Sequence, residues 1–489
     1  MIDPAAEQHV VSAVPKQLFI GGAWVDATAG ATFEVVDPST GQVLCSVADA
    51  SAEDGMKALG AAASAQSAFS AIPPRQRADM LMAAFRLLHE RIDDLALLMT
   101  LEMGKPLAES RGEIAYAAEF FRHFSEEAVR INGGYQVAPA GGARFLVARQ
   151  PVGPCLLITP WNFPMAMGTR KIGPAIAAGC TSVIKPAAKT PLSMLALADI
   201  LREAGVPDGV VNVVTTTQAG EVMEPQIRSG LARKLSFTGS TAVGRRLLEQ
   251  CADKVLRTSM ELGGNAAFIV FPDADLDAAV EGALAAKMRN SGEACTAANR
   301  LYVHADVLDE FGKRLAQRMG ELPVGRGVED GIRVGPLIDE AARDKVQSLV
   351  DDAVARGAQL LTGGKAVDGD GYFYPPTVLT EVPESARMRH EEIFGPVAAI
   401  SSFITEDEVI AAGNDTEYGL VSYVYTNDLR LALRVAEALE SGMVGLNQGV
   451  VSNPAAPFGG VKASGLGREG GPTGIDEFLE TKYIGIAMD

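Results

Sequence analysis

Apolar residues recur along this chain with two different spacings, one typical of helices and one typical of strands. Helical spacing predicts helices over residues 51–70, 75–103 and 108–131, and the first of these opens with Ser-Ala-Glu-Asp, a capping box. Short apolar runs separated by turn residues predict strands over 18–50. The N-terminal part of the chain is therefore expected to be mainly helical, with a small β segment before the helices.

Between residues 152 and 262 the pattern changes to short, continuously apolar runs that alternate with helical segments. Continuous apolar strands joined by helices are typical of a parallel sheet covered on both faces. The strands are expected at 155–159, 181–184, 210–214, 234–237 and 256–262. The helices between them are expected at 172–178, 193–204, 219–229 and 242–254.

A second alternating region covers about 266–450, so two α/β domains are the simplest account of the chain. Residues 132–150 are rich in glycine and strand-like, and they are expected to form a projecting hairpin. The tail ends in the apolar run Tyr-Ile-Gly-Ile-Ala-Met, a strand that would need to be covered, and another subunit would supply the cover.

Composition narrows the classes of function. The 489 residues include 43 Lys and Arg against 61 Asp and Glu, a net charge of −18, which disfavours a nucleic acid partner and requires a local basic pocket for any anionic ligand. The uncharged run 151–169 contains four prolines, so it is not expected to cross a membrane. The N-terminus lacks a secretory signal pattern and the five cysteines are scattered, so a cytoplasmic location is expected. No CxxC or HExxH spacing occurs and the five histidines do not cluster, so no metal site is expected.

Two glycine-rich segments are candidates for phosphate binding. Gly239 and Ser240 lie in Phe-Thr-Gly-Ser-Thr-Ala-Val-Gly, which follows an expected strand and opens an expected helix, where backbone N–H groups favour a phosphate. An ordinary strand-to-helix turn explains the same residues. The segment 465–470 matches G-x-G-x-x-G, but no expected strand precedes it and no room remains for a βαβ unit, so it is interpreted as a chance match.

Three further residues are candidates for catalysis, each with a simpler explanation. Cys295 lies among small residues in Ser-Gly-Glu-Ala-Cys-Thr-Ala-Ala-Asn-Arg, where a cysteine is usually a buried filler. Glu261 ends an apolar strand before two glycines, where a charge facing water is ordinary. Asn162 follows the first strand of the expected sheet, as turn residues do, although ligands of open α/β folds bind in such loops.

Taken together, these segments resemble the aldehyde dehydrogenase superfamily. The matching segments are, in order, TPWNFP, VIKPAAKTP, FTGSTAVG, MELGG, SGEACTAANR, EEIFGPV and PFGGVKASGLGREGG. The resemblance implies an α/β subunit with a Rossmann-like, five-stranded NAD(P)-binding domain (1–127 and 148–260), an α/β catalytic domain (261–469) and a small β oligomerisation arm (128–147 and 470–489). It also implies a homodimer or homotetramer.

The same resemblance implies that Cys295 is the nucleophile, Glu261 the general base and Asn162 an oxyanion donor. A cysteine thiolate would attack the aldehyde, and the Asn162 amide and the Cys295 N–H would hold the oxyanion. Glu261 would then activate water to hydrolyse the thioester. A free thiol titrates near ~8.5, so the site is expected to lower the pKa of Cys295 with nearby positive or dipolar groups.

For the cofactor, the resemblance implies contacts from Trp161, Lys185, Gly239, Ser240, Leu262, Glu392 and Phe394. Ser240 would meet the pyrophosphate, Lys185 the adenosine ribose and Glu392 the nicotinamide ribose. The segment KPAAK departs from the common KPAE form at Ala188, where a carboxylate would repel a 2′-phosphate, and Lys189 adds a cation nearby. NADP is therefore expected to serve at least as well as NAD.

For the substrate, Arg170, Arg289 and Ser452 fall where the members of this family that oxidise succinate semialdehyde bind the substrate carboxylate. Two arginines and a hydroxyl suit a planar carboxylate. The alternative is that each arginine pairs with a local acidic residue such as Glu293. Ala297 stands where some members carry a second cysteine, which excludes a disulfide within this loop.

The sequence thus predicts NAD(P)-dependent oxidation of succinate semialdehyde to succinate, with another small aldehyde such as glutarate semialdehyde as the alternative substrate. A CoA-acylating enzyme would release the thioester to CoA rather than water, and Glu261 argues for hydrolysis. The presence of all three catalytic residues argues against a non-catalytic protein of the same fold. A cysteine hydrolase would require a histidine close to Cys295, and His304 is the only candidate nearby in sequence.

Overall fold

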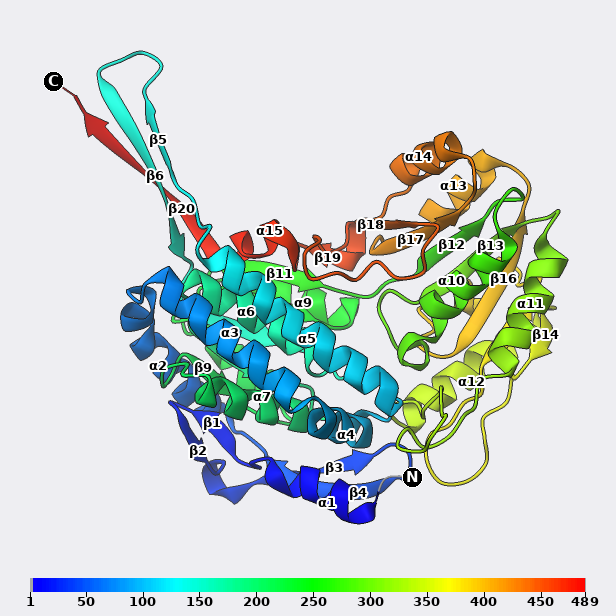
Figure 1. Cartoon of the computed structure of the whole chain (residues 1–489), viewed down its shortest axis with the longest axis horizontal. Helices are drawn as coiled ribbons and strands as arrows, with labels where there is room; N and C mark the ends of the chain where they lie inside the picture. The colour runs from blue at the N-terminus through cyan, green and yellow to red at the C-terminus, as the bar shows by residue number, and fades with distance from the viewer. Residues whose placement is uncertain (1–2, 489) are drawn as a thin grey trace.

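A computed structural model describes residues 3–488, which form two α/β lobes and a projecting ribbon (Figure 1). The first lobe is built on an eight-stranded sheet in the order β19-β11-β10-β7-β8-β9-β1-β2. Its centre consists of five parallel strands: β7 (Cys155–Ile158), β8 (Ser182–Lys185), β9 (Val211–Val213), β10 (Lys234–Thr238) and β11 (Arg257–Glu261). Each coincides with a strand predicted from a continuous apolar run, which confirms those predictions.

Three antiparallel strands widen this sheet beyond the five that were expected. They are β1 (Leu18–Ile20) and β2 (Ala23–Val25) at one edge and β19 (Gly465–Leu466) at the other. The five expected strands form the parallel core of the sheet, and segments from both ends of the chain cover its edges. The strands β3 (Thr32–Asp37) and β4 (Gln42–Ala48) form a separate two-stranded ribbon.

Helices cover both faces of the parallel strands. The four that connect them are α6 (Ala166–Ala178), α7 (Leu192–Glu203), α8 (Ala219–Arg228) and α9 (Thr241–Ala252). The earlier helices are α1 (Pro4–Ala13), α2 (Ala52–Ser70), α3 (Pro74–Glu90), α4 (Ile92–Met103) and α5 (Leu107–Ala128). The capping box is present at the start of α2. The helix predicted over 75–103 is two helices, divided at Arg91, where acidic residues open α4 and favour a new helix start.

The second lobe contains a seven-stranded sheet in the order β14-β15-β16-β13-β12-β17-β18, parallel except for β14. Its strands are β12 (Ala266–Val270), β13 (Ala298–His304), β14 (Gln359–Thr362), β15 (Thr377–Thr380), β16 (Val397–Phe403), β17 (Val421–Tyr425) and β18 (Met443–Leu446). Its helices are α10 (Leu276–Met288), α11 (Leu308–Gly320), α12 (Glu340–Ala355), α13 (Glu406–Asn414) and α14 (Leu429–Ala438). This region confirms the second alternating segment predicted from the sequence.

A three-stranded sheet, called the arm below, extends from the body (Figure 1). It consists of β5 (Gly134–Val137), β6 (Ala143–Pro151) and β20 (Leu479–Ala487), and β20 follows the short helix α15 (Gly471–Gly474). The predicted hairpin and the predicted strand of the tail are both present, and β20 pairs with the full length of β6. Among residues 3–488, no helix is long and apolar enough to cross a membrane.

Strand order defines where a ligand can enter the first lobe. The strands β8 and β9 lie on one side of β7, whereas β10 and β11 lie on the other. In open α/β sheets, ligands bind at the carboxyl ends of the strands where the order reverses. This place lies between β7 and β10, so the loops that begin at Thr159 and Gly239 flank it.

Candidate active site

A cleft of about 390 Å³ opens at the carboxyl ends of β7, β10 and β11, between the two lobes. The predicted catalytic residues Asn162, Glu261 and Cys295 all line it. So do seven of the predicted cofactor residues: Trp161, Lys189, Gly239, Ser240, Leu262, Glu392 and Phe394. The structure thus gathers in one cleft side chains that the sequence separates by more than 200 positions.

Two predicted cofactor residues, Lys185 and Ala188, are not among the side chains that line this cleft. Lys185 ends β8 and is buried, and this burial lowers its pKa to about 8. It lies in register with Ile158 of β7, so it stands at the same edge of the sheet as the cleft.

The loop that carries Cys295 has an unusual backbone. After α10, Asn290, Ser291 and Gly292 follow one another with φ values of 54°, 54° and 79°. Left-handed backbone is costly for residues other than glycine and persists where surrounding contacts enforce it. At Gly292, a Cβ would lie 2.1 Å from the carbonyl oxygen of Gly395, so only glycine fits there. The loop is therefore held in a defined, strained shape before the nucleophile.

The surroundings of Cys295 raise its pKa rather than lower it. Burial raises this pKa to about 12, and Glu392 and Glu261 add to the rise, while Arg170 and Arg289 oppose it. The expectation that nearby positive or dipolar groups lower the pKa of Cys295 is therefore wrong, because desolvation outweighs the effect of both arginines. The thiol must lose its proton to a neighbouring acceptor as it reacts.

Glu261 is suited to accept protons. Both carboxyl oxygens are buried, and neither has a hydrogen-bond partner among the described residues. Burial, with repulsion from Glu469, raises the pKa of Glu261 well above its usual range, although Lys171 and Arg170 partly offset the rise. A carboxylate with a raised pKa is a stronger base than a solvated one, and this suits general base catalysis near neutral pH.

Asn162 lies in the loop after β7, with its side chain buried. Its Nδ2 donates a hydrogen bond to the carbonyl oxygen of Glu293 at 3.0 Å. An amide nitrogen carries two hydrogens, so the second can be donated to another acceptor in the cleft. This arrangement ties Asn162 directly to the loop of Cys295.

The cofactor side of the cleft combines a helix start with apolar walls. Ser240 is the N-cap of α9, and the N–H of Gly239 donates to the carbonyl oxygen of Glu261 at 3.0 Å. The rings of Trp161 and Phe394 meet edge to face at 5.5 Å. Glu392 accepts a hydrogen bond from the N–H of Gly264 at 3.2 Å, and burial raises its pKa to about 7.

The charge of Lys189 is less available to a ligand than the sequence suggested. Its ammonium group forms an ion pair with Asp339 and lies 5.7 Å from the centre of the Trp161 ring. Asp339 also caps α12, where its other carboxyl oxygen accepts the N–H of Ala342 at 2.8 Å. The charge of Lys189 is therefore partly neutralised by a carboxylate that the sequence places 150 positions away.

A second, much smaller cavity adjoins Cys295 and contains all three predicted substrate residues, Arg170, Arg289 and Ser452. Arg289 donates to the Oγ of Ser452 at 3.2 Å and lies over the Phe163 ring at 4.7 Å. Arg170 donates to the hydroxyl of Tyr116 at 2.9 Å. The three residues are thus brought together next to Cys295.

The two arginines differ in their acidic neighbours. Arg170 is 2% exposed and its Nε lies 3.3 Å from the carboxylate of Glu469. Within residues 3–488, no carboxylate lies within ion-pair distance of Arg289. The alternative of a local acidic partner therefore holds for Arg170, with Glu469 rather than Glu293 as the partner, and does not hold for Arg289.

Sequence reasoning missed the other walls of this cavity: Tyr116, Phe163, Met167, Thr296 and Phe458. Phe163 lies in the TPWNFP segment and Phe458 in the PFGGVK segment, so their motifs gave a usable signal. Tyr116 lies on α5, where aromatic residues at helical spacing cannot be told from ordinary core residues.

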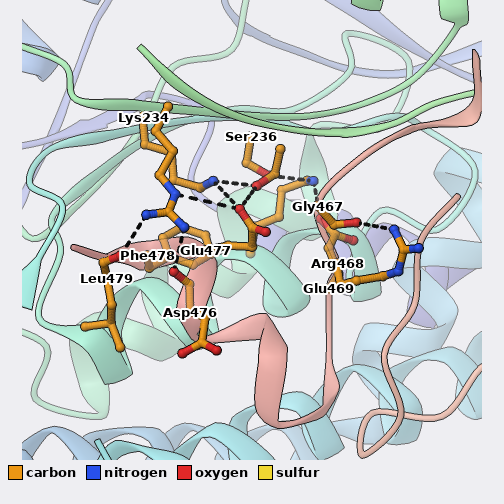
Figure 2. Close-up of polar contacts among 12 residues, drawn as sticks. Lys234, Ser236, Gly467, Arg468, Glu469, Asp476, Glu477, Phe478 and Leu479 are labelled. Carbon is orange, nitrogen blue, oxygen red and sulfur yellow. Dashed lines mark hydrogen bonds and ion pairs between the residues drawn. The ribbon is translucent and has the colours of Figure 1, made fainter. Parts of the chain in front are cut away.

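Two neighbouring groups of polar contacts surround Glu469 and Glu477 (Figure 2). Lys171 contacts Glu469 and donates to Ser236 at 2.9 Å. Nearby, Ser259 donates to Glu477 at 2.9 Å. The G-x-G-x-x-G segment that contains Glu469 forms β19 and a turn, in line with its interpretation as a chance match. The contact with Lys171 holds Glu469 in place, and repulsion from Glu469 contributes to the raised pKa of Glu261.

Comparisons with known proteins agree with the site. Residues 24–484 match the aldehyde dehydrogenase family. The chain is 57% identical to a succinate-semialdehyde dehydrogenase of Paenarthrobacter nicotinovorans, over 91% of this chain and 99% of that protein. It is 51% identical to a glutarate-semialdehyde dehydrogenase of Pseudomonas putida, over 97% of this chain and 98% of that protein.

Among solved structures, an NADP-dependent enzyme of E. coli superposes with a TM-score of 0.96 at 51% identity, over 97% of this chain and 98% of that one. The resemblance drawn from the motifs and the predicted α/β fold are thereby confirmed. Among the described residues, no group of three or more His, Cys, Asp or Glu side chains could hold a metal ion.

Proposed function

Because this chain belongs to the aldehyde dehydrogenase family, we propose that it oxidises succinate semialdehyde to succinate with NADP or NAD as the hydride acceptor. The observation that carries this proposal is Arg289, a guanidinium beside Cys295 that has no carboxylate within ion-pair distance among residues 3–488, in a protein of net charge −18. A substrate that brings its own carboxylate would complete this site, whereas an uncharged aldehyde would leave the cation without a counterion.

Cys295 starts the reaction by adding its sulfur to the aldehyde carbon, and its proton passes to a nearby base. The carbonyl oxygen becomes an oxyanion, and the free hydrogen of the Asn162 amide is available to stabilise it. A bound nicotinamide supplies the acceptor for the hydride that leaves the carbon. The substrate then remains on Cys295 as a thioester, with its carbonyl still near Asn162.

Glu261 completes the cycle by taking a proton from the water that attacks the thioester carbon. The carbon–sulfur bond breaks, the carboxylic acid leaves, and the thiol is restored. In total, one aldehyde, one water and one oxidised cofactor give one carboxylate, one reduced cofactor and two protons. The raised pKa of Glu261 supports this assignment, since a stronger base removes the proton of water more readily.

The residues of the cleft fit a nicotinamide dinucleotide. The helix α9 opens toward the cleft after Gly239 and Ser240, where a pyrophosphate would be held by backbone N–H groups. Leu262, Trp161 and Phe394 provide apolar walls for planar groups, and the carboxylate of Glu392 suits ribose hydroxyls. We assign these residues, with Lys185, to cofactor binding.

We propose that NADP is used at least as well as NAD. Ala188 offers no carboxylate that would repel a 2′-phosphate, and Lys189 provides a cation nearby. Its ion pair with Asp339 weakens this attraction, so the absence of repulsion at Ala188 is the stronger argument. The solved relative of E. coli described as NADP-dependent is in line with this preference.

The test is a panel of aldehydes assayed with both cofactors by NAD(P)H absorbance. Succinate semialdehyde should give the highest kcat/KM, and butanal, which has the same chain length without the carboxylate, should be much poorer. Glutarate semialdehyde is the second candidate, because a relative named for that substrate covers nearly the whole chain. A higher kcat/KM for butanal than for either semialdehyde would refute the proposal.

We also propose that the chain forms a homodimer or homotetramer through the arm. Tyr483, Ile484 and Ile486 of β20 are 62%, 40% and 39% exposed, and the outer edges of β5 and β20 have no neighbouring strand among the described residues. An exposed edge strand with apolar side chains is a surface for pairing with a second copy. Light scattering on the full chain and on a variant lacking the tail from Leu479 would test this.

We place the protein in the cytoplasm, where its five free cysteines remain reduced.

A further inference from the structure

A buried ion pair lies against the segment that carries Asn162. Lys105 and Glu113 have side chains that are each 1% exposed, and their charged atoms are 2.5 Å apart. Lys105 lies between α4 and α5, and Glu113 lies in the second turn of α5. Neither residue lines the cleft or the cavity beside Cys295, so the chemistry described above does not use them.

Among residues 3–488, the hydrogen bonds that the two side chains make beyond each other go to the segment that carries Asn162. The ammonium of Lys105 donates to the backbone carbonyl oxygen of Asn162 at 2.7 Å. One oxygen of Glu113 accepts the N–H groups of Met165 and Ala166 at 3.0 and 3.1 Å, where α6 begins. The pair thus fixes Asn162 itself and the helix start that follows it.

The same region of the chain also holds the loop of the nucleophile. Glu109, one helical turn before Glu113 on α5, accepts the N–H of Asn290 at 2.7 Å. The side chain of Asn290 donates to the carbonyl oxygen of Asn162 at 3.1 Å. Residues four apart share one face of a helix, so one face of α5 supports both catalytic loops.

We infer that Lys105 and Glu113 are positioning residues that hold the Asn162 amide in place for the oxyanion. A buried ion pair contributes little net stability, because desolvation offsets its attraction. Its charge-assisted hydrogen bonds are nevertheless short and directional, and they fix an irregular loop that itself belongs to no strand or helix. Oxyanion stabilisation depends on donor position within tenths of an ångström, so this support acts on the rate.

This inference rests on the proposed role of Asn162, and a double-mutant cycle tests it. The first variant replaces both charges at once, Lys105→Met with Glu113→Gln, so that no unpaired charge stays buried. The amide oxygen introduced at position 113 can still accept the two N–H groups of α6. The second variant is Asn162→Ala, and the third combines all three substitutions.

The measured quantity is the rate of NAD(P)H formation in the first turnover. Loss of an oxyanion donor costs about 100- to 1,000-fold, so Asn162→Ala should show a loss of this size. We expect the Lys105/Glu113 variant to lose about 10- to 100-fold in rate, with the KM for cofactor changed less than about threefold. In the Asn162→Ala background the same pair of substitutions should cost less than about threefold.

Glu102→Gln is the matched control. Glu102 is another fully buried carboxylate, and it accepts the N–H groups of Leu192 and Ser193 at 2.7 and 2.8 Å where α7 begins. Among residues 3–488, its hydrogen bonds go to Leu192 and Ser193 and none goes to Asn162 or to the loop of Cys295. This variant should lower the melting temperature while leaving the first-turnover rate within about twofold of the wild type, since its contact is structural only.

If the neutralised pair does not fold, Lys105→Arg keeps the charge and replaces the ammonium by a longer, planar group that must displace the Asn162 carbonyl. Equal rate losses in the presence and absence of the Asn162 side chain would overturn the inference, as would a wild-type rate in the Lys105 and Glu113 variants. The cycle uses whichever aldehyde of the panel reacts fastest. A poor rate with succinate semialdehyde therefore changes the substrate assignment alone, whereas a wild-type rate in Asn162→Ala would overturn the positioning role as well.

Discussion

The sharpest prediction concerns Arg289 and the charge of the substrate. Replacing it by methionine removes the guanidinium but keeps an unbranched side chain that can still cover the Phe163 ring. In the wild type, Arg289 has a single hydrogen bond, to Ser452, and no acidic partner within ion-pair distance among the described residues. Its remaining donors are available to a substrate carboxylate.

The size of the effect follows from that geometry. A hydrogen bond to a charged group contributes about 1.5–3 kcal/mol, and about 1.4 kcal/mol corresponds to a factor of ten in rate. Arg289→Met should therefore lower kcat/KM for succinate semialdehyde roughly 10- to 150-fold. For butanal the loss should stay below about threefold, because this substrate has no carboxylate to bind.

The assay compares kcat/KM for the two aldehydes under one set of conditions, with two further variants. Arg289→Lys keeps the charge but loses the planar fork, so it should recover part of the preference for succinate semialdehyde. Arg170→Met should impair both aldehydes, because it leaves Glu469 without one of its cations beside Glu261. Equal losses for both aldehydes in Arg289→Met would show that Arg289 does not bind the substrate carboxylate, and this would refute the substrate assignment.

Four further outcomes are expected. Cys295→Ala should remove NAD(P)H production at an unchanged melting temperature, and measurable residual turnover would contradict covalent catalysis by this residue. Glu261→Gln should give a burst of NAD(P)H without steady turnover. In the wild type, the rate of thioester hydrolysis should still rise with pH in a range where an ordinary glutamate, with a pKa of about 4.3, is already ionised, because the raised pKa keeps Glu261 protonated to higher pH. A flat profile there would argue against Glu261 as the base. Ala188→Glu should shift the ratio of kcat/KM values toward NAD, and an unchanged ratio would mean that this position does not contact the ribose.

The positions of the main strands and helices could be predicted from the sequence, because they depend on the local spacing of apolar and capping residues. Continuous apolar runs predicted all five parallel strands of the first lobe, and Ser51 with Asp54 predicted the start of α2. Asn162 and Glu261 were placed in one site only by the resemblance of their motifs to a family, and the structure brings both to one cleft at the carboxyl ends of parallel strands.

Contacts between distant segments decided what local patterns could not. The helix α6 begins earlier than the apolar pattern indicated, and Glu113 supplies the cap that its own sequence lacks. Lys189 and Arg170 are both paired with carboxylates far away in the chain, at Asp339 and Glu469. Such pairs leave no periodic trace in the sequence, because an ion pair needs only two residues that the fold brings together.

The pKa values of the catalytic groups also depended on the tertiary structure. The family resemblance of their motifs indicated a nucleophile at Cys295 and a base at Glu261, but the direction of the thiol pKa shift was expected wrongly. Desolvation is a property of everything packed around a group, and here it outweighs the two arginines that the sequence placed near Cys295. The sequence by itself determined which groups can react, whereas the enclosure built by both lobes decided how strongly each one holds its proton.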